Sequence, residues 1–380
     1  MTAEELTEMV WRLSDLCLSG KSSVSLKEKE PEYVLHTASP IEYSDSSPIL
    51  AATTSDYCVR LYNRSNLASF QVLSGHTDVV TDIRFSHTDS NLLYTSSIDE
   101  TIRCWDIRIK GKKEAQIFKG YESSGNRFLS CDISAMDALL CAGTECDESS
   151  KDALIVFWDV RMKNATGTFT DSHSDHITQV RFHPSHFHKM ASGSVDGLVC
   201  LFDLREQGED NAITQILNAE SSVNQIGWCK RDGMDSIYCT TSIETMYVWN
   251  EEGDMLSDLK SLREDNEESH HIDYLVDCFY DNEADNLYLV AGDHSGSTHI
   301  FSVDGNSAPH VHSLSKGHKA TLRCLTWDQK SKTLVTGGED SMVCLWKSDQ
   351  VTSPKKKVED GAKLKSKKKE RGKKQRDKPY

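Results

Sequence analysis

Hydrophobic and polar residues alternate along short stretches of this chain, and similar stretches recur at nearly regular intervals. In residues 80–85 apolar and polar side chains alternate, as expected of a strand whose two faces meet different surroundings. Residues 92–97 predict a second strand, residues 101–105 a third and residues 114–118 a fourth, with a tight turn at 98–100. A sheet of four such strands cannot bury its faces alone and has to stack on neighbours.

The unit occurs seven times, and each copy ends in an aromatic residue followed by a polar one. The aromatic residues are Tyr62, Trp105, Trp158, Phe202, Trp249, Phe301 and Trp346, which are 43, 53, 44, 47, 52 and 45 residues apart. This spacing is close to the period of roughly 40–45 residues that is typical of β-propellers with four strands per blade. The sequence therefore predicts an all-β, seven-bladed β-propeller.

Three of the seven repeats share two further spacings. A histidine stands nine residues before the aromatic of the first strand, and an aspartate stands six residues before the aromatic of the third strand. The pairs are His76 and Asp99 in the second repeat, His173 and Asp196 in the fourth, and His318 and Asp340 in the seventh. These shared offsets are stronger evidence for the architecture than the period alone.

With this arrangement the chain resembles the WD-repeat (WD40) family, most clearly in residues 152–162, 173–184 and 337–340. The resemblance implies that a His, a strand Ser or Thr, the turn Asp and the Trp form a buried hydrogen-bonded relay. The implied relays are His76, Thr95, Asp99 and Trp105; His173, Ser192 and Asp196; and His318, Thr336, Asp340 and Trp346. In the fourth repeat Phe202 replaces Trp and has no N–H to donate. The fifth and sixth repeats depart further, with Ala219, Ile243 and Ser295 in relay positions.

A His–Asp pair also occurs in catalytic sites, but catalysis needs one site and this pair recurs in three repeats. The sequence contains no glycine-rich phosphate loop, no G-x-S-x-G motif and no H-E-x-x-H motif. We therefore expect a protein that is not an enzyme and has no cofactor. The resemblance implies a scaffold that holds other macromolecules together.

One loop contains three histidines, His183, His186 and His188, and histidine clusters can bind metal ions. No carboxylate or cysteine accompanies them in the sequence, so we favour an exposed turn and predict no metal site. Twelve cysteines without a C-x-x-C pair, together with an acidic N-terminus that lacks a secretory signal, indicate a reducing intracellular compartment. No apolar run is long enough to span a membrane.

The predicted organisation has three parts. Residues 1–20 form an N-terminal extension, with an amphipathic helix over 3–18. Residues 21–350 form the propeller, which is expected to be monomeric. Its seventh blade needs a fourth strand, and Val24–Leu26 is the candidate because pairing of the chain ends removes exposed strand edges. Residues 351–380 form a disordered tail.

Charge is distributed unevenly between these parts. The tail contains 13 Lys and Arg residues and four acidic residues, and the whole chain has a net charge of −16, so residues 1–350 carry −25. Lys355, Lys356 and Lys357 resemble a nuclear-import signal, and the tail favours a nuclear or nucleolar location, with the cytoplasm as the alternative. The tail also suits weak nucleic-acid binding through phosphates. The acidic body suits basic partners such as histones or ribosomal proteins.

A second hypothesis rests on a repeated Trp-Asp-x-Arg sequence, which resembles the box that links some WD-repeat proteins to the adaptor of a cullin-RING ubiquitin ligase. The positions are Asp106, Arg108, Asp159 and Arg161, with Arg205 in an echo of the motif in the fourth repeat. Under the structural alternative, each arginine stays on its own blade. For partner contacts on the top face beside the channel, the predicted residues are Thr81, Thr178, Arg323 and Glu339.

Overall fold

The computed structural model describes residues 13–25, 31–40, 48–109, 114–120, 125–146, 153–266 and 270–348. The chain divides into a compact unit, Met1–Asp349, and a second unit, Gln350–Tyr380. The basic tail and its lysines 355–357 lie outside the described residues, so the structural account concerns the first unit.

Seven antiparallel sheets of four strands make up the described part of this unit. Blade one contains β2 (Val34–Ala38), β3 (Ile49–Thr54), β4 (Cys58–Asn63) and β5 (Ala68–Ser74). Blade two contains β6 (Val80–Phe85), β7 (Leu92–Ser97), β8 (Thr101–Asp106) and β9 (Gln116–Lys119). Blade three contains β10 (Phe128–Ile133), β11 (Leu139–Thr144), β12 (Ile155–Asp159) and β13 (Gly167–Phe169).

The remaining blades follow the same order except the last. Blade four contains β14 (Ile177–Phe182), β15 (Lys189–Ser194), β16 (Leu198–Asp203) and β17 (Ile213–Asn218). Blade five contains β18 (Val223–Arg231), β19 (Met234–Thr241), β20 (Met246–Asn250) and β21 (Met255–Leu259). Blade six contains β22 (Tyr274–Asp281), β23 (Asn286–Gly292), β24 (Thr298–Ser302) and β25 (His310–Leu314). Blade seven contains β26 (Leu322–Asp328), β27 (Thr333–Gly338), β28 (Met342–Ser348) and β1 (Leu16–Ser23).

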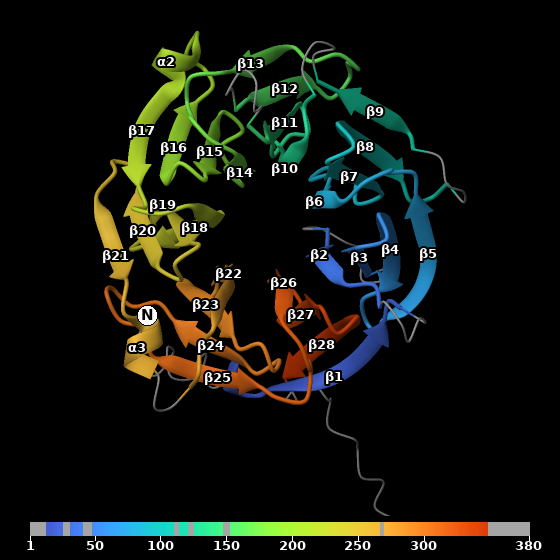
Figure 1. Ribbon diagram of the computed structural model, residues 1–380, viewed down its shortest axis with the longest axis vertical. Coiled ribbons are helices and arrows are strands. Elements are labelled where there is room, and N and C mark those ends of the chain that lie inside the picture. Colours follow the sequence, from blue (N-terminus) through green and yellow to red (C-terminus); the bar gives the residue numbers. More distant parts are fainter. Residues whose placement is uncertain are drawn as a thin grey trace, which may run out of the picture. The chain divides into compact units, whose positions relative to one another are not determined.

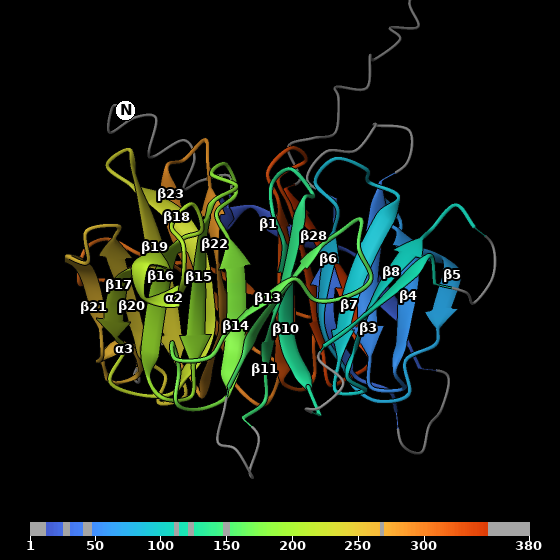
Figure 2. The same ribbon diagram turned by 90° about the horizontal axis from the view of Figure 1, so that it is seen from above.

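The sheets are arranged in a ring, with the first strand of each blade nearest the central axis and the fourth strand outside (Figure 1). The strands run between the two faces of the ring (Figure 2). Seven hydrophobic clusters fill the spaces between neighbouring blades, one for each interface. Each sheet is therefore buried on both faces by its neighbours, and the predicted seven-bladed propeller is confirmed.

Blade seven is completed by the first strand of the chain, as predicted, but not by the predicted residues. β1 pairs with β28, with Leu16 opposite Ser348 and Ser23 opposite Met342, and Figure 1 shows it in blue along the outer side of red β28. Val24 only follows this strand and donates its N–H to Ser341 O at 2.9 Å. The prediction of a closing strand at Val24–Leu26 is therefore wrong.

The predicted helix over 3–18 is wrong for residues 16–18, and residues 1–12 lie outside the described part. Exposure alternates along β1, with Leu16 buried and Cys17 exposed, which is the period of a strand. Pairing with the open edge of β28 overrides the helical spacing of the apolar residues. The proposed boundary after residue 20 falls inside β1, so the propeller begins at Leu16. The outer strand expected at 114–118 is instead Gln116–Lys119.

The same irregularity occurs in all seven blades where the first and second strands pair. In six blades a one-residue shift in register follows the first residue of the inner strand, as between Val80 and Asp82 in blade two. In blade six it follows the second residue, Leu275. Such bulges redirect a side chain and increase the local twist. The two short helices of the described residues, α2 (Glu209–Ala212) and α3 (Leu262–Asn266), follow blades four and five. Neither is long or apolar enough to cross a membrane.

Candidate functional site

The relay residues of blade two lie in a continuous chain of hydrogen bonds. His76 Nδ1 is 2.8 Å from Asp99 Oδ2, and His76 Nε2 is 2.8 Å from Thr95 Oγ1. The indole N–H of Trp105 donates to the same Thr95 oxygen at 2.9 Å. If the imidazole is neutral, Trp donates to Thr, Thr to His and His to Asp. Each ring nitrogen and the hydroxyl of this relay then has a hydrogen-bond partner.

Blade seven contains the same chain of contacts. His318 Nδ1 is 3.0 Å from Asp340 Oδ1, His318 Nε2 is 2.8 Å from Thr336 Oγ1, and Trp346 Nε1 donates to Thr336 Oγ1 at 2.8 Å. His318 is buried and the Thr336 hydroxyl is fully enclosed. Burial alone would raise the pKa of Asp340, but its hydrogen bond with His318 holds the pKa below the usual range. The side chains of His318 and Asp340 are thus largely buried within the blade.

Blade four has the relay without its last member. His173 Nδ1 is 3.1 Å from Asp196 Oδ2, and His173 Nε2 is 2.7 Å from Ser192 Oγ. Phe202 occupies the third-strand position and offers no donor to Ser192. The residue before the histidine also differs, because Ser172 stands where the other two relays have Gly75 and Gly317.

The other blades use different contacts at the corresponding places. In blade one the turn residue Asp56 pairs with Arg60 at 2.8 Å. In blade three the Trp158 indole donates to the backbone oxygen of Lys119 at 3.0 Å. In blade five Trp249 stacks on Tyr247 with ring centroids 5.3 Å apart. The third-strand aromatic is buried in all seven blades.

The residues predicted to contact partners on the top face lie at the bulges or beside them. Thr81 and Thr178 are the bulge residues of blades two and four. Their hydroxyls donate at 2.7 Å to the backbone oxygens of Phe128 and Val223, the first residues of the next blades' inner strands. Their hydroxyl groups are therefore committed to contacts between blades.

The other two predicted top-face residues pair with each other. Arg323, the bulge residue of blade seven, forms an ion pair with Glu339. Its side chain is 54% exposed, so the pair lies at the surface. Of the four predicted positions, only these two present charged groups to solvent.

The repeated Asp-x-Arg residues form local ion pairs on three blades. Arg108 pairs with Asp106 at 2.7 Å, Arg161 with Asp159 at 2.5 Å, and Arg205 with Asp203 at 2.5 Å. The three arginine side chains are 58%, 87% and 64% exposed. The arginines' hydrogen bonds lower the pKa of Asp159 and of Asp203 to about 2. Each arginine thus stays on its own blade yet remains accessible.

A charged cluster near the central axis was not predicted. Asp82 Oδ2 lies 3.0 Å from Arg181, which is 99 residues away in blade four, and 3.3 Å from Arg84. Arg84 Nε is 3.5 Å from Asp132 Oδ1, and Asp132 accepts the Phe182 N–H at 2.7 Å. Burial would raise the pKa of Asp82, but Arg84 and Arg181 hold it below the usual value. The cluster joins the inner strands of three consecutive blades, two, three and four.

A pocket of about 240 Å³ adjoins this cluster where the inner strands end. Its lining includes Thr37, Arg84, Asp132, Arg181, Pro184 and Thr326, which come from five blades. The alternation of charged and apolar residues in the inner strands was the available signal, since Asp82 and Arg84 flank buried Ile83. The sequence did not indicate which blades would meet.

The histidines in the loop of blade four have a carboxylate neighbour that the sequence did not indicate. Asp235 of blade five lies 3.2 Å from His183 Nε2 and 3.4 Å from His186 Nε2, so the expectation that no carboxylate accompanies these histidines is wrong. His183 is buried, and its Nδ1 accepts the backbone N–H groups of Ser185 and His186 at 3.1 and 3.0 Å. Its proton therefore lies on Nε2, facing Asp235, and no ring lone pair remains for a metal ion.

Comparison with known proteins identifies WD repeats in three parts of the chain. A sequence profile described as WD domain, G-beta repeat, matches residues 68–106, 164–203 and 309–347. Each match ends at the third strand of a blade that contains a relay histidine, so the three relay blades are those the profile detects.

Similarity to two relatives extends well beyond these three matches. The chain is 31% identical over 346 residues to a WD repeat-containing protein 89 homolog of Dictyostelium discoideum, covering 86% of this chain and 90% of the relative. It is 29% identical over 352 residues to the WD repeat-containing protein GTS1 of Arabidopsis thaliana, covering 84% of this chain and 82% of that relative. A shorter match, 30% identical over 137 residues, joins 35% of this chain to 28% of a ribosome biogenesis protein WDR12 homolog of Ixodes scapularis.

Proposed function

The chain belongs to the WD-repeat family, and from this premise we propose that it is a non-enzymatic scaffold that binds a basic protein in the nucleus or nucleolus through blades four to six. WD-repeat proteins are generally protein-interaction scaffolds. The buried His–Asp pairs have a structural explanation in three blades, which supports a binding role rather than catalysis.

The distribution of acidic residues carries this proposal. Residues 206–285 contain 20 Asp and Glu residues and four Lys and Arg residues. Several of the acidic side chains are exposed, including Glu206, Asp210, Glu252 and Glu264. Their summed negative potential attracts basic proteins and speeds their association. Histones and ribosomal proteins have the required charge, and one partial relative is named a ribosome biogenesis protein.

Charge reversal on this surface tests the proposal. The Glu252→Lys/Glu264→Lys variant should bind core histones or basic ribosomal proteins several-fold more weakly than the parent chain, with a shallower salt dependence. The matched control is Glu100→Lys/Asp171→Lys, which changes the net charge equally at exposed positions outside residues 206–285. Equal losses in both variants, or binding that is indifferent to salt, would contradict a specific acidic surface.

The basic tail supports the nuclear part of the proposal. Lys355, Lys356 and Lys357 are the residues that an import receptor would bind, and the remaining basic residues suit weak contacts with nucleic-acid phosphates. Replacement of the three lysines by alanine in the full chain should shift a fluorescent fusion from the nucleus to the cytoplasm. Unchanged distribution would contradict a role for these lysines in import.

The exposure of the Asp-x-Arg arginines favours a second candidate function, as substrate receptor of a cullin-RING ubiquitin ligase. Arg108 and Arg161 occur on adjacent blades and are accessible despite their ion pairs. Arg108→Ala/Arg161→Ala should abolish co-purification of a ligase adaptor and leave the fold intact, because exposed ion pairs contribute little to stability. Arg127→Ala is the control, since this arginine is 57% exposed and lies outside the motif. An adaptor that never co-purifies with the parent chain excludes this function.

A further inference from the structure

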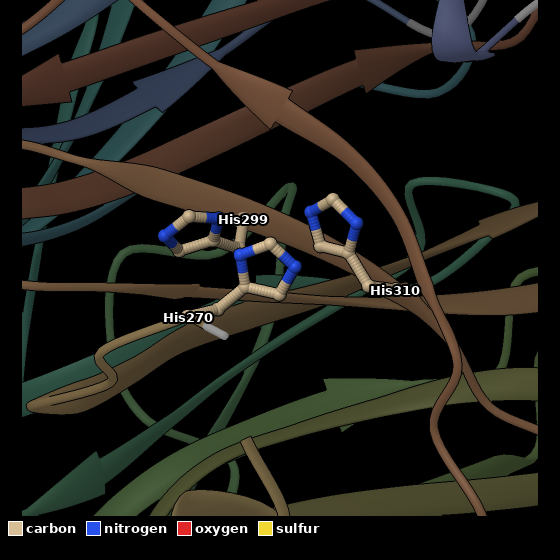
Figure 3. Close-up of side chains that lie close together, drawn as sticks. All are labelled: His270, His299 and His310. Carbon is tan, nitrogen blue, oxygen red and sulfur yellow. The ribbon is translucent and has the colours of Figure 1, made fainter. Parts of the chain in front are cut away.

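Three histidines from separated parts of the chain meet at the outer part of blade six (Figure 3). His299 belongs to β24, His310 to β25, and His270 lies shortly before β22. One ring nitrogen from each lies within 4.8 Å of the others. His270 stacks on His310 with ring centroids 3.8 Å apart and lies 4.7 Å from His299.

The cluster lies beside the hydrophobic core between blades five and six. Phe301 shares a face of β24 with His299 and packs in that core, together with Leu262 of α3 and Ile272. His270 contacts Phe301 edge-on at 6.5 Å. The cluster therefore joins blade six to the segment that enters it from blade five.

Ser313 fixes the orientation of two of the three rings. Its Oγ lies 2.9 Å from His299 Nδ1 and 2.9 Å from His310 Nε2. A hydroxyl oxygen has two lone pairs and can accept both N–H groups. In that arrangement His299 Nε2 and His310 Nδ1 carry lone pairs, which is the form of imidazole that binds metal ions. Ser313 then has the role of an outer-shell partner that holds a ligand ring in place.

The loop cluster of His183 differs from this arrangement, because both nitrogens of the His183 ring are already occupied.

We propose that His270, His299 and His310 form a zinc site that ties the segment before β22 to the two outer strands of blade six. Three imidazoles and a water molecule are the tetrahedral ligand set of zinc sites that keep an open fourth position. Zn–N bonds of about 2.0–2.1 Å require the ligand nitrogens to move closer together and the His270 ring to tilt out of its stack. The site reinforces a blade in which Ser295 and Phe301 replace relay residues.

Metal titration of the purified full chain tests the site. After removal of metal with a chelator, the chain should bind one Zn²⁺, measured by calorimetry against a competing chelator. Co²⁺ at the same site should give the visible absorption of a tetrahedral complex. His270→Asn and His299→Asn should each lower the affinity at least 100-fold, and Ser313→Ala, which keeps all three ligands, should lower it roughly 10- to 100-fold.

The control is His271→Asn, because His271 is adjacent in the chain, 68% exposed and outside the cluster. This variant should bind zinc like the parent chain. Circular dichroism of each metal-free variant shows whether the propeller is intact, and His270, which is only partly buried, is the substitution that the fold tolerates best. The proposal is overturned if the parent chain binds no zinc, or if folded His270→Asn and Ser313→Ala bind it as tightly as the parent. In that case the three rings form an aromatic cluster only.

Discussion

A Cβ atom added to Gly317 would overlap the indole ring of Trp346. Blade two has the same relationship, since a Cβ at Gly75 would lie 3.0 Å from the Trp105 ring. Blade four has a serine before its relay histidine and a phenylalanine in the third strand. A side chain at the position before the histidine therefore competes for space with the third-strand aromatic, so we expect the residues at these two positions to depend on each other.

This coupling predicts non-additive stability in blade seven. Gly317→Ser should destabilise the chain by about 1–3 kcal/mol through overpacking, and Trp346→Phe by about 1–3 kcal/mol, because it leaves a cavity and removes a hydrogen bond. The double variant, which reproduces the blade-four pair, should cost at least about 1 kcal/mol less than the sum. Urea unfolding measures all three.

Gly167→Ser provides the control for the added side chain, because a Cβ atom added to Gly167 would have no described atom within 4 Å. Its effect should be small. Strictly additive losses in blade seven would contradict the coupling.

The relay hydroxyl should contribute more to the free energy of unfolding in blade two than in blade four. Thr95→Val leaves both the His76 ring and the Trp105 indole without their partner, whereas Ser192→Ala affects only His173. Because each unpaired buried group costs about 1–3 kcal/mol, the loss for Thr95→Val should be roughly twice that for Ser192→Ala. Thermal unfolding checks the ranking, and a larger loss for Ser192→Ala would be inconsistent with it.

Mild acid should destabilise the propeller through His183. Burial lowers the pKa of this ring to about 4 from an ordinary value of 6.5, so between these pH values the unfolded chain binds a proton that the folded chain does not. The stabilisation is complete above about pH 6.5 and is lost as the pH falls towards 4. Urea unfolding at several pH values should show this decline, and His183→Asn should reduce its slope. An unchanged slope in the variant would exclude His183 as its source.

Removal of β1 should open the ring. A chain that begins at Val24 loses the partner of β28 and the buried side chains of Leu13 and Leu16. An unpaired edge strand promotes association between molecules, so we expect oligomers in light scattering and a lower melting temperature. A chain that begins at Leu13 retains β1 and is the control. A monomeric, equally stable product from the shorter chain would show that β1 is dispensable.

The propeller could be predicted because its determinants are local. The repeated aromatic, the paired offsets of His and Asp, and the alternation within strands all lie within one repeat, and they gave the number of blades. That an N-terminal strand closes the ring could be predicted, but its residues could not, because residues 16–18 also continue the helical spacing of the apolar residues before them. The choice between helix and strand there depends on the edge of β28, more than 300 residues later in the sequence.

The candidate sites were harder to predict because several of them join residues that lie far apart in the sequence. The relay contacts could be placed residue by residue, since each joins residues within one repeat. Asp82 of blade two meets Arg181 of blade four, and Asp235 reaches the His183 loop from the next blade. His270, His299 and His310 carry no shared local pattern, so only the fold brings them together.

The pairing of β1 with β28 also bears on how the chain is made in the cell. Leu16 emerges from the ribosome more than 300 residues before its partner Ser348. At about 5–20 residues per second, the first strand waits roughly 15–65 s for its partner. Throughout translation the nascent chain therefore has two incomplete edges, and a product that terminates early cannot close. Completion of the ring thus distinguishes chains that contain β28 from chains that terminate before it.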